Sequence, residues 1–242
     1  MKKEHEEILH AVFSEVKTFE DLIEGYTKYY NGEIPVSPNS AGPVEEETFN
    51  QLNLIKTINQ AGFLTTDSQD GITKKGIIKG IEWEIVERRY IEGIIGNEYE
   101  IVQRATVQGF MRKKLYDKLY SFIKKTDLII FGYDILTEEF RTKLKILVTF
   151  QKSNSVETDL SHINIISYGK SLWDSITAYS PKMQEHNDIY FVTIFDPTWK
   201  RSNYMLETIH NILINKKSLK GGDMDYLDKY KKYKRKYLKL KK

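Results

Sequence analysis

The sequence predicts an α/β fold, with mixed α+β as the alternative: a single mixed-sheet domain with flanking helices, followed by a basic, tyrosine-rich helix. Three observations support this. Hydrophobic residues make up 40% of the 242 residues and aromatic residues 12%, enough for a packed core. Helical and strand-like apolar patterns alternate over the second half of the chain, as expected of a sheet with crossover helices. The charge changes sign near residue 216.

The first half is predicted to hold two helices and a β-rich segment. Apolar residues at helical spacing indicate a helix within 6–30. A second helix begins near three glutamates at 45–47, which suit a helix N-terminus, and ends at Gly62. After this helix the sequence predicts a short buried strand at 63–67 and a glycine- and lysine-rich loop at 68–80. Two β-rich stretches follow at 83–95 and 99–110, joined as a hairpin at Gly96-Asn97.

The second half is predicted to alternate between helices and strands. Apolar residues at helical spacing predict three helices, and short apolar runs predict four buried strands. Pro197 ends the last strand, because proline cannot continue a ladder of backbone hydrogen bonds. The predicted helices are 112–125, 137–143 and 204–214, and the predicted strands are 127–133, 145–150, 163–168 and 189–195.

Charge divides the chain into two parts. Twelve Lys/Arg and three Asp fall between residues 216 and 242, a balance of +9, whereas the whole chain carries +3, so residues 1–215 carry −6. We therefore expect a domain of unknown function at 1–215 and a separate basic tail at 216–242. The chain has no cysteine, which excludes disulfides, thiolate metal sites and cysteine nucleophiles. Its apolar runs are too short for a transmembrane segment, and no signal peptide is expected.

A row of apolar side chains follows the tail at helical spacing. The residues recur at steps of 4, 3, 4 and 3, which places them on one seam of a helix surrounded by lysines. A helix this short and this highly charged is only marginally stable by itself. We therefore expect the tail to become helical when it binds a partner. Regularly spaced tyrosines favour a protein groove; single-stranded nucleic acid and a solvated arm are the alternatives. The partner-binding candidates are Tyr226, Tyr230, Tyr233, Tyr237 and Leu240.

The tail, YLDKYKKYKRKYLKLK from Tyr226 to Lys241, resembles the Lys/Tyr-rich C-terminal extensions of many nucleocytoplasmic large DNA virus proteins, including those of mimivirus-like viruses, chloroviruses and iridoviruses. The resemblance implies a viral protein, located in the virion or in the host cytoplasm at the viral factory, that docks to a capsid or other viral protein. The body is similar to an uncharacterised domain family also found in bacteria, for which no activity is implied. The matching segments are 40–48, 58–71, 103–110 and 196–199.

A polar turn after the first strand is the main candidate for a ligand site. Residues 65–71 offer hydroxyls, carboxylates and an amide at a strand end, where open α/β sheets bind ligands; the alternative is a turn that satisfies its own backbone. Arg104 would pair with Asp67 or with a phosphate. Asp196 would be a metal ligand or a general base, or would start an Asp-Pro turn. The candidate pocket comprises Thr66, Asp67, Ser68, Gln69, Arg104 and Asp196.

The familiar catalytic and metal-binding signatures do not occur in this sequence. Gly169-Lys170-Ser171 lacks the earlier glycine of a phosphate-binding loop. The five histidines lack metal-ligand spacing, and there is no Gly-x-Ser-x-Gly. We therefore expect no metal and no cofactor, and enzymatic activity stays open. Three functions follow: docking of a viral protein through its tail, a hydrolase or phosphate- or nucleotide-binding enzyme that uses residues 65–71, and nucleic-acid binding through the tail.

Overall fold

The structure of the protein is a computed structural model, which describes most of the domain. The described residues are 3–44, 48–49, 51–77, 83–86, 89–92, 98–136, 145–153, 156–164, 169–183, 187–198 and 203–214. The predicted tail helix, with its tyrosine seam, and the predicted helix at 137–143 lie outside them.

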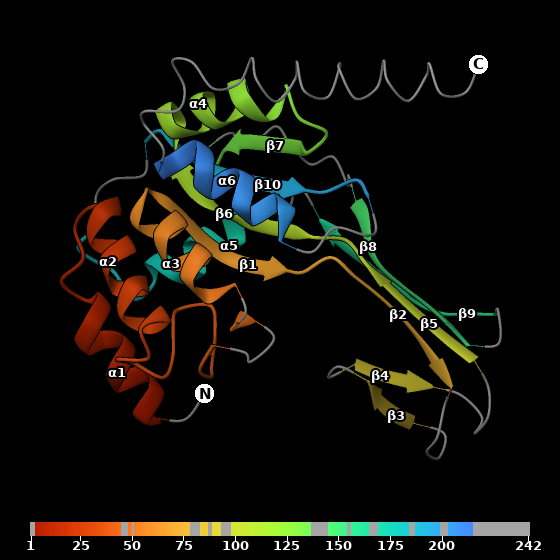
Figure 1. Ribbon diagram of the computed structural model, residues 1–242. Helices are drawn as coiled ribbons and strands as arrows, with labels where there is room; N and C mark the ends of the chain where they lie inside the picture. Colours follow the sequence, from red (N-terminus) through yellow and green to blue (C-terminus); the bar gives the residue numbers. More distant parts are fainter. Residues whose placement is uncertain are drawn as a thin grey trace.

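The described residues form six helices and ten strands (Figure 1). The helices are α1 (Lys3–Phe13), α2 (Phe19–Tyr30), α3 (Leu52–Gln60), α4 (Lys113–Ile123), α5 (Gly169–Thr177) and α6 (Tyr204–Ile214). The strands are β1 (Phe63–Gln69), β2 (Ile72–Ile77), β3 (Trp83–Val86), β4 (Arg89–Glu92), β5 (Glu98–Gln103), β6 (Thr106–Arg112), β7 (Ile129–Asp134), β8 (Lys145–Ser153), β9 (Val156–Asn164) and β10 (Ile189–Phe195).

The strands form three sheets, and every pairing among the described strands is antiparallel. The first sheet has the order β1-β6-β10-β7, the second β2-β5-β8-β9, and β3 pairs with β4. Because β10 is antiparallel to both neighbours, β6 and β7 run in the same direction on either side of it. Helix α4 joins them, so it is a crossover helix. The α/β prediction is confirmed.

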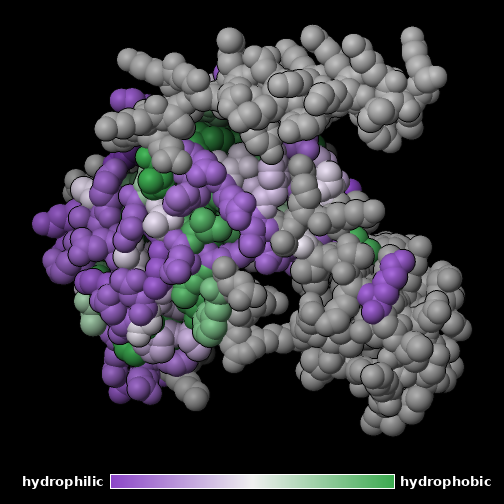
Figure 2. All heavy atoms as spheres, in the orientation of Figure 1, coloured by the Kyte–Doolittle hydropathy of each residue, from purple (hydrophilic) through white to green (hydrophobic). Residues whose placement is uncertain are grey.

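Helices cover both faces of the first sheet (Figure 1). Helices α3 and α4 each contact α6 on one face, and α5 packs on the other. Buried Trp173 of α5 lies between Phe19 of α2 and Phe110 of β6, with ring centroids 6.2 and 5.0 Å away. The outer surface over α1, α2 and α3 is mainly hydrophilic (Figure 2), as expected of helices whose apolar faces point into the core.

The predicted helix at 6–30 is two helices. Chain direction changes between Phe13 and Phe19, where Thr18 begins α2 with a capping box. The Thr18 hydroxyl accepts a hydrogen bond from the Asp21 N–H, and the Asp21 carboxylate accepts one from the Thr18 N–H, at 3.1 and 3.0 Å. Backbone N–H donors from Lys17 and Thr18 lower the pKa of Asp21. Apolar spacing alone therefore missed a boundary that the capping residues specify.

Two predictions for the β-rich segment are wrong. Residues 68–69 belong to β1 and 72–77 form β2, so the predicted loop at 68–80 is largely strand. Strand β5 supplies the hydrogen-bonding partner for β2, and this non-local pairing overrides the weak strand propensity of Lys74, Lys75 and Gly76. The described strands of the stretches at 83–95 and 99–110 do not pair across the two stretches: β3 pairs with β4, and β5 pairs with β2 and β8. The predicted turn at Gly96-Asn97 lies outside the described residues.

Candidate functional site

A polar pocket of about 220 Å³ lies where the end of α2, the loop at 37–44 and the middle of β1 meet. Three of the predicted site residues, Thr66, Asp67 and Ser68, line it. The remaining lining residues come from segments that sequence analysis did not connect with β1. They are Tyr29, Tyr30, Ser37, Asn39, Ser40, Val44 and Thr48.

Tyrosines of α2 fix the loop over the pocket. The Tyr26 hydroxyl donates to Asn39 Oδ1 at 2.6 Å, and the Tyr29 hydroxyl donates to the Gly42 carbonyl at 3.1 Å. Asn39 Nδ2 then donates to the Thr66 carbonyl at 2.8 Å, which ties the loop to β1. Spacings of three and four residues put Tyr26, Tyr29 and Tyr30 on the buried face of α2. Burial raises the pKa of the Tyr26 and Tyr30 hydroxyls, so both stay protonated donors.

A β-bulge at Thr66 presents the polar residues of β1. Thr65 pairs with Gly109 of β6 and Asp67 pairs with Gln108, which leaves Thr66 as the extra residue. The Thr66 hydroxyl donates back to the Gln108 carbonyl at 3.3 Å. Beyond the bulge, Asp67 is exposed and Ser68 is half-buried. The bulge therefore converts a buried strand into one wall of the pocket.

A buried hydrogen-bond network supports the bulge from below. Asn59 of α3 is fully buried, and its Nδ2 donates to Thr65 Oγ1 at 2.6 Å and to the Ile55 carbonyl at 2.9 Å. The Thr65 N–H donates to Asn59 Oδ1 at 3.1 Å. On the other side, the Tyr30 hydroxyl donates to the Thr65 carbonyl at 2.8 Å. Thr65 is thus held by two side chains from two different helices.

The lining of the pocket is hydroxyl-rich and anionic. Seven of the ten lining residues that the structure describes carry a hydroxyl group, Asp67 supplies a carboxylate, and none of these ten is a lysine or an arginine. The Asp67 carboxylate also contributes to the raised pKa of Tyr30, although burial of that hydroxyl is the larger cause. The pocket can therefore accept hydrogen bonds from neutral or cationic groups, whereas a phosphate would meet a like charge.

The other three predicted residues, Gln69, Arg104 and Asp196, lie together at a different place, the common end of β1, β6 and β10. Gln69 Nε2 donates to the Arg104 carbonyl at 3.0 Å. Asp196 is fully buried, and its Oδ1 accepts a hydrogen bond from the Thr198 N–H at 2.8 Å. Partial burial lowers the pKa of Arg104, and the Asp196 charge opposes this effect. The six candidates therefore form two groups, a pocket group and a strand-end group.

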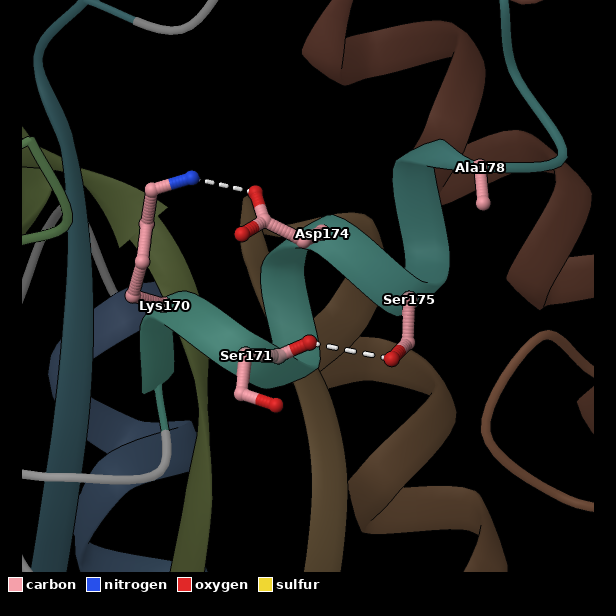
Figure 3. Close-up of a pocket in the computed structure, with 5 residues that line it drawn as sticks. All are labelled: Lys170, Ser171, Asp174, Ser175 and Ala178. Carbon is pink, nitrogen blue, oxygen red and sulfur yellow. Dashed lines mark hydrogen bonds and ion pairs between the residues drawn. The ribbon is translucent and has the colours of Figure 1, made fainter.

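The Gly-Lys-Ser triplet begins α5 beside an open hollow (Figure 3). The hollow is lined by Lys170, Ser171, Asp174, Ser175 and Ala178, all from one surface of α5 and its end. Lys170 pairs with Asp174, and the Ser175 hydroxyl donates to the Ser171 carbonyl at 3.0 Å. The Gly169 N–H donates to the Tyr133 hydroxyl at 2.9 Å, so a tyrosine covers this helix N-terminus. The arrangement is that of a solvated helix surface.

A family model described as a domain of unknown function, DUF6919, matches residues 9–216. The chain belongs to this family. No curated protein matches the chain. The DUF6919 match contains both groups of candidate residues and ends where the basic tail begins. The expectation of an uncharacterised domain family is confirmed.

Two further properties concern the part of the chain that the structure describes. None of its helices is both long enough and apolar enough to cross a membrane. Nor does it place three or more His, Cys, Asp or Glu side chains together in a group that could hold a metal ion. The described lining of the DUF6919 pocket offers hydroxyl, amide and carboxylate groups.

Proposed function

We propose that the DUF6919 domain binds a small neutral or cationic molecule rich in hydroxyl groups, of the size of a monosaccharide, in the pocket between α2 and β1. The supporting observation is the described part of the lining, which offers hydroxyls, an amide and the Asp67 carboxylate and contains no lysine or arginine. Ligand hydroxyls would donate charge-assisted hydrogen bonds to Asp67, and tyrosine rings would contact the apolar face of a sugar. The volume is below the roughly 300 Å³ at which pockets for drug-sized ligands begin.

This proposal modifies the enzyme hypothesis drawn from the sequence. Phosphate and nucleotides suit the pocket poorly, because Arg104 belongs to the strand-end group and Asp67 is the charged residue among the described lining residues. A hydrolase with Asp67 as general base would use the same pocket, since that carboxylate lies among groups that bind hydroxyls. Ligand binding is therefore the property to measure first, before any reaction.

We expect Asp67→Asn to weaken binding of a neutral sugar about tenfold or more, because it removes a charged hydrogen-bond acceptor. Saturation-transfer NMR of the full chain with a mixture of glucose, galactose, ribose and glycerol identifies the ligand, and titration gives Kd. Asp174→Asn in the α5 hollow is the matched control and should leave Kd unchanged. Absence of a signal from all four compounds, or binding of inorganic phosphate that survives Asp67→Asn, would refute the proposal.

We also propose that the tail at 216–242 docks the domain to a viral structural protein. The supporting observations are the tyrosine seam, the charge of +9 next to a domain of −6, and the resemblance to tails of large DNA virus proteins. Binding of nucleic acid by the tail is the alternative, supported by the same lysines.

Replacing the four seam tyrosines by serine should reduce packaging into virions at least tenfold, because the seam loses its apolar contact area. The full-length wild type and variant are expressed during infection and quantified in purified virions by mass spectrometry. A second variant, Lys231→Arg with Lys232→Arg, keeps seam and charge and should be packaged normally. Equal packaging of all three forms would show that the seam is not the docking element.

A further inference from the structure

Helix α4 carries a concentrated positive charge on an otherwise acidic domain. From Arg112 to Lys125 the chain has six basic residues and one aspartate, a balance of +5. Since residues 1–215 carry −6, the rest of the domain carries −11. Residues 112–125 therefore have a net positive charge while the rest of the domain is net negative, which favours an anionic partner at this segment.

Most of these basic side chains form no ion pair with the described part of the domain. Arg112 contacts Glu20 and Lys113 contacts Asp117, each at 2.7 Å or less. The other four lysines form no ion pair with any residue that the structure describes. These unpaired lysines are Lys114 and Lys118 of α4 and Lys124 and Lys125, which directly follow its last residue, Ile123. Together they are called the lysine surface of α4.

Aromatic rings border the lysine surface and one of them is open to solvent. Tyr120 is 45% exposed, and the Lys124 ammonium lies 6.0 Å from its ring centroid. Behind it the rings of Tyr116 and Tyr190 continue the row, with successive centroids 5.9 and 5.2 Å apart. Tyr116 in turn lies against Gly132 of β7, where a Cβ would come within 2.3 Å of the ring. Tyr116 and Tyr190 thus connect the row to the sheet, and Tyr120 lies at its exposed end.

We propose that the surface of α4 formed by these lysines and Tyr120 binds single-stranded nucleic acid. Phosphates would contact the unpaired lysines, and an unpaired base would stack on Tyr120. A duplex does not present its base faces to such a ring. An anionic membrane fits less well as a partner. Tyr120 is the one exposed large hydrophobic residue of α4, so the helix offers little apolar area to insert into a bilayer.

The test uses the full chain and fluorescein-labelled oligothymidine, with affinity measured by fluorescence anisotropy between 50 and 200 mM salt. Lys124→Glu with Lys125→Glu should weaken binding at least tenfold. It should also reduce the salt slope, the steepness with which log Kd changes with log salt concentration, by about 1.4, because each phosphate contact on a single strand contributes about 0.7. The matched control is Lys3→Glu with Lys17→Glu, an equal change of charge on α1 and before α2, and it should weaken binding less than threefold. Equal losses for both pairs would overturn the proposal.

Two further measurements distinguish binding at α4 from binding at the basic tail, and a comparison with lipid vesicles distinguishes nucleic acid from a membrane as the partner. Tyr120→Ala should weaken binding about fivefold or more, as expected for one stacked base, with an unchanged salt slope. Ultraviolet crosslinking with mass spectrometry should place thymidine on peptides of α4. Crosslinks confined to residues 216–242, no effect of Tyr120→Ala, or tighter binding to phosphatidylserine vesicles than to oligothymidine would each overturn it.

Discussion

Gly109→Ala is expected to lower the free energy of unfolding by about 3 kcal/mol or more, because the new methyl group has no space. A Cβ on Gly109 would lie 2.0 Å from the Leu64 carbonyl oxygen and 2.8 Å from Thr65 Cα. Both atoms belong to the backbone of β1, so no side-chain rotation relieves the clash. The substitution must separate β1 from β6 next to the bulge, and we expect sugar binding in the pocket to weaken with it.

Gly42→Ala is the matched control for this substitution. A Cβ at Gly42 meets nothing within 4 Å, so the urea unfolding midpoint should shift little. Urea unfolding of the two variants and the wild type, followed by circular dichroism, gives the comparison. Equal midpoints for Gly109→Ala and Gly42→Ala would contradict the close approach of β1 to Gly109.

Asn59→Leu should lower the free energy of unfolding by about 3 kcal/mol, although leucine has the same branching and the same number of side-chain heavy atoms as asparagine. The substitution removes three hydrogen bonds of a fully buried amide and leaves the Thr65 N–H without its acceptor. Burying an unsatisfied donor is unfavourable by itself, and here it coincides with loss of the contact that fixes the bulge. Hydrogen exchange of the Thr65 amide should accelerate together with the fall in stability.

Asn53→Leu on the same helix is the control, because that side chain is exposed. It should change the free energy of unfolding by less than about 0.5 kcal/mol. Urea unfolding and amide exchange measured by NMR distinguish the two positions. If the Thr65 amide proton exchanges as slowly in Asn59→Leu as in the wild type, the Tyr30 hydroxyl alone is enough to hold the bulge.

Elements with long local patterns could be predicted from the sequence, and elements that depend on distant partners could not. Helix α6 has the predicted bounds, 204–214, and strand β10 has the predicted bounds, 189–195. Both are continuous apolar patterns with clear ends, so local information is sufficient. Strand β2 exists because β5 pairs with it, and nothing within residues 72–77 shows that partner.

The same distinction explains the candidate site. Thr66, Asp67 and Ser68 could be found because a polar run directly follows buried residues of a strand. Tyr29, Tyr30 and Asn39 lie about 30 residues earlier, and their convergence depends on α2 packing beside β1 and on the bulge opposite Gly109. The polar strand-end residues Gln69, Arg104 and Asp196 do meet, but through backbone contacts that a sequence does not show.

The hydrogen bonds around Thr65 also bear on how separate molecules meet. Among the described strands β1 is an outer strand of its sheet, with β6 on one side only. An outer strand normally exposes backbone groups to which a strand of another molecule can add. Here Asn59 and Tyr30 occupy the N–H and carbonyl of Thr65, and Asn39 occupies the carbonyl of Thr66. The side chains that shape the pocket thereby also block edge-to-edge pairing, and so protect the protein against aggregation along this strand.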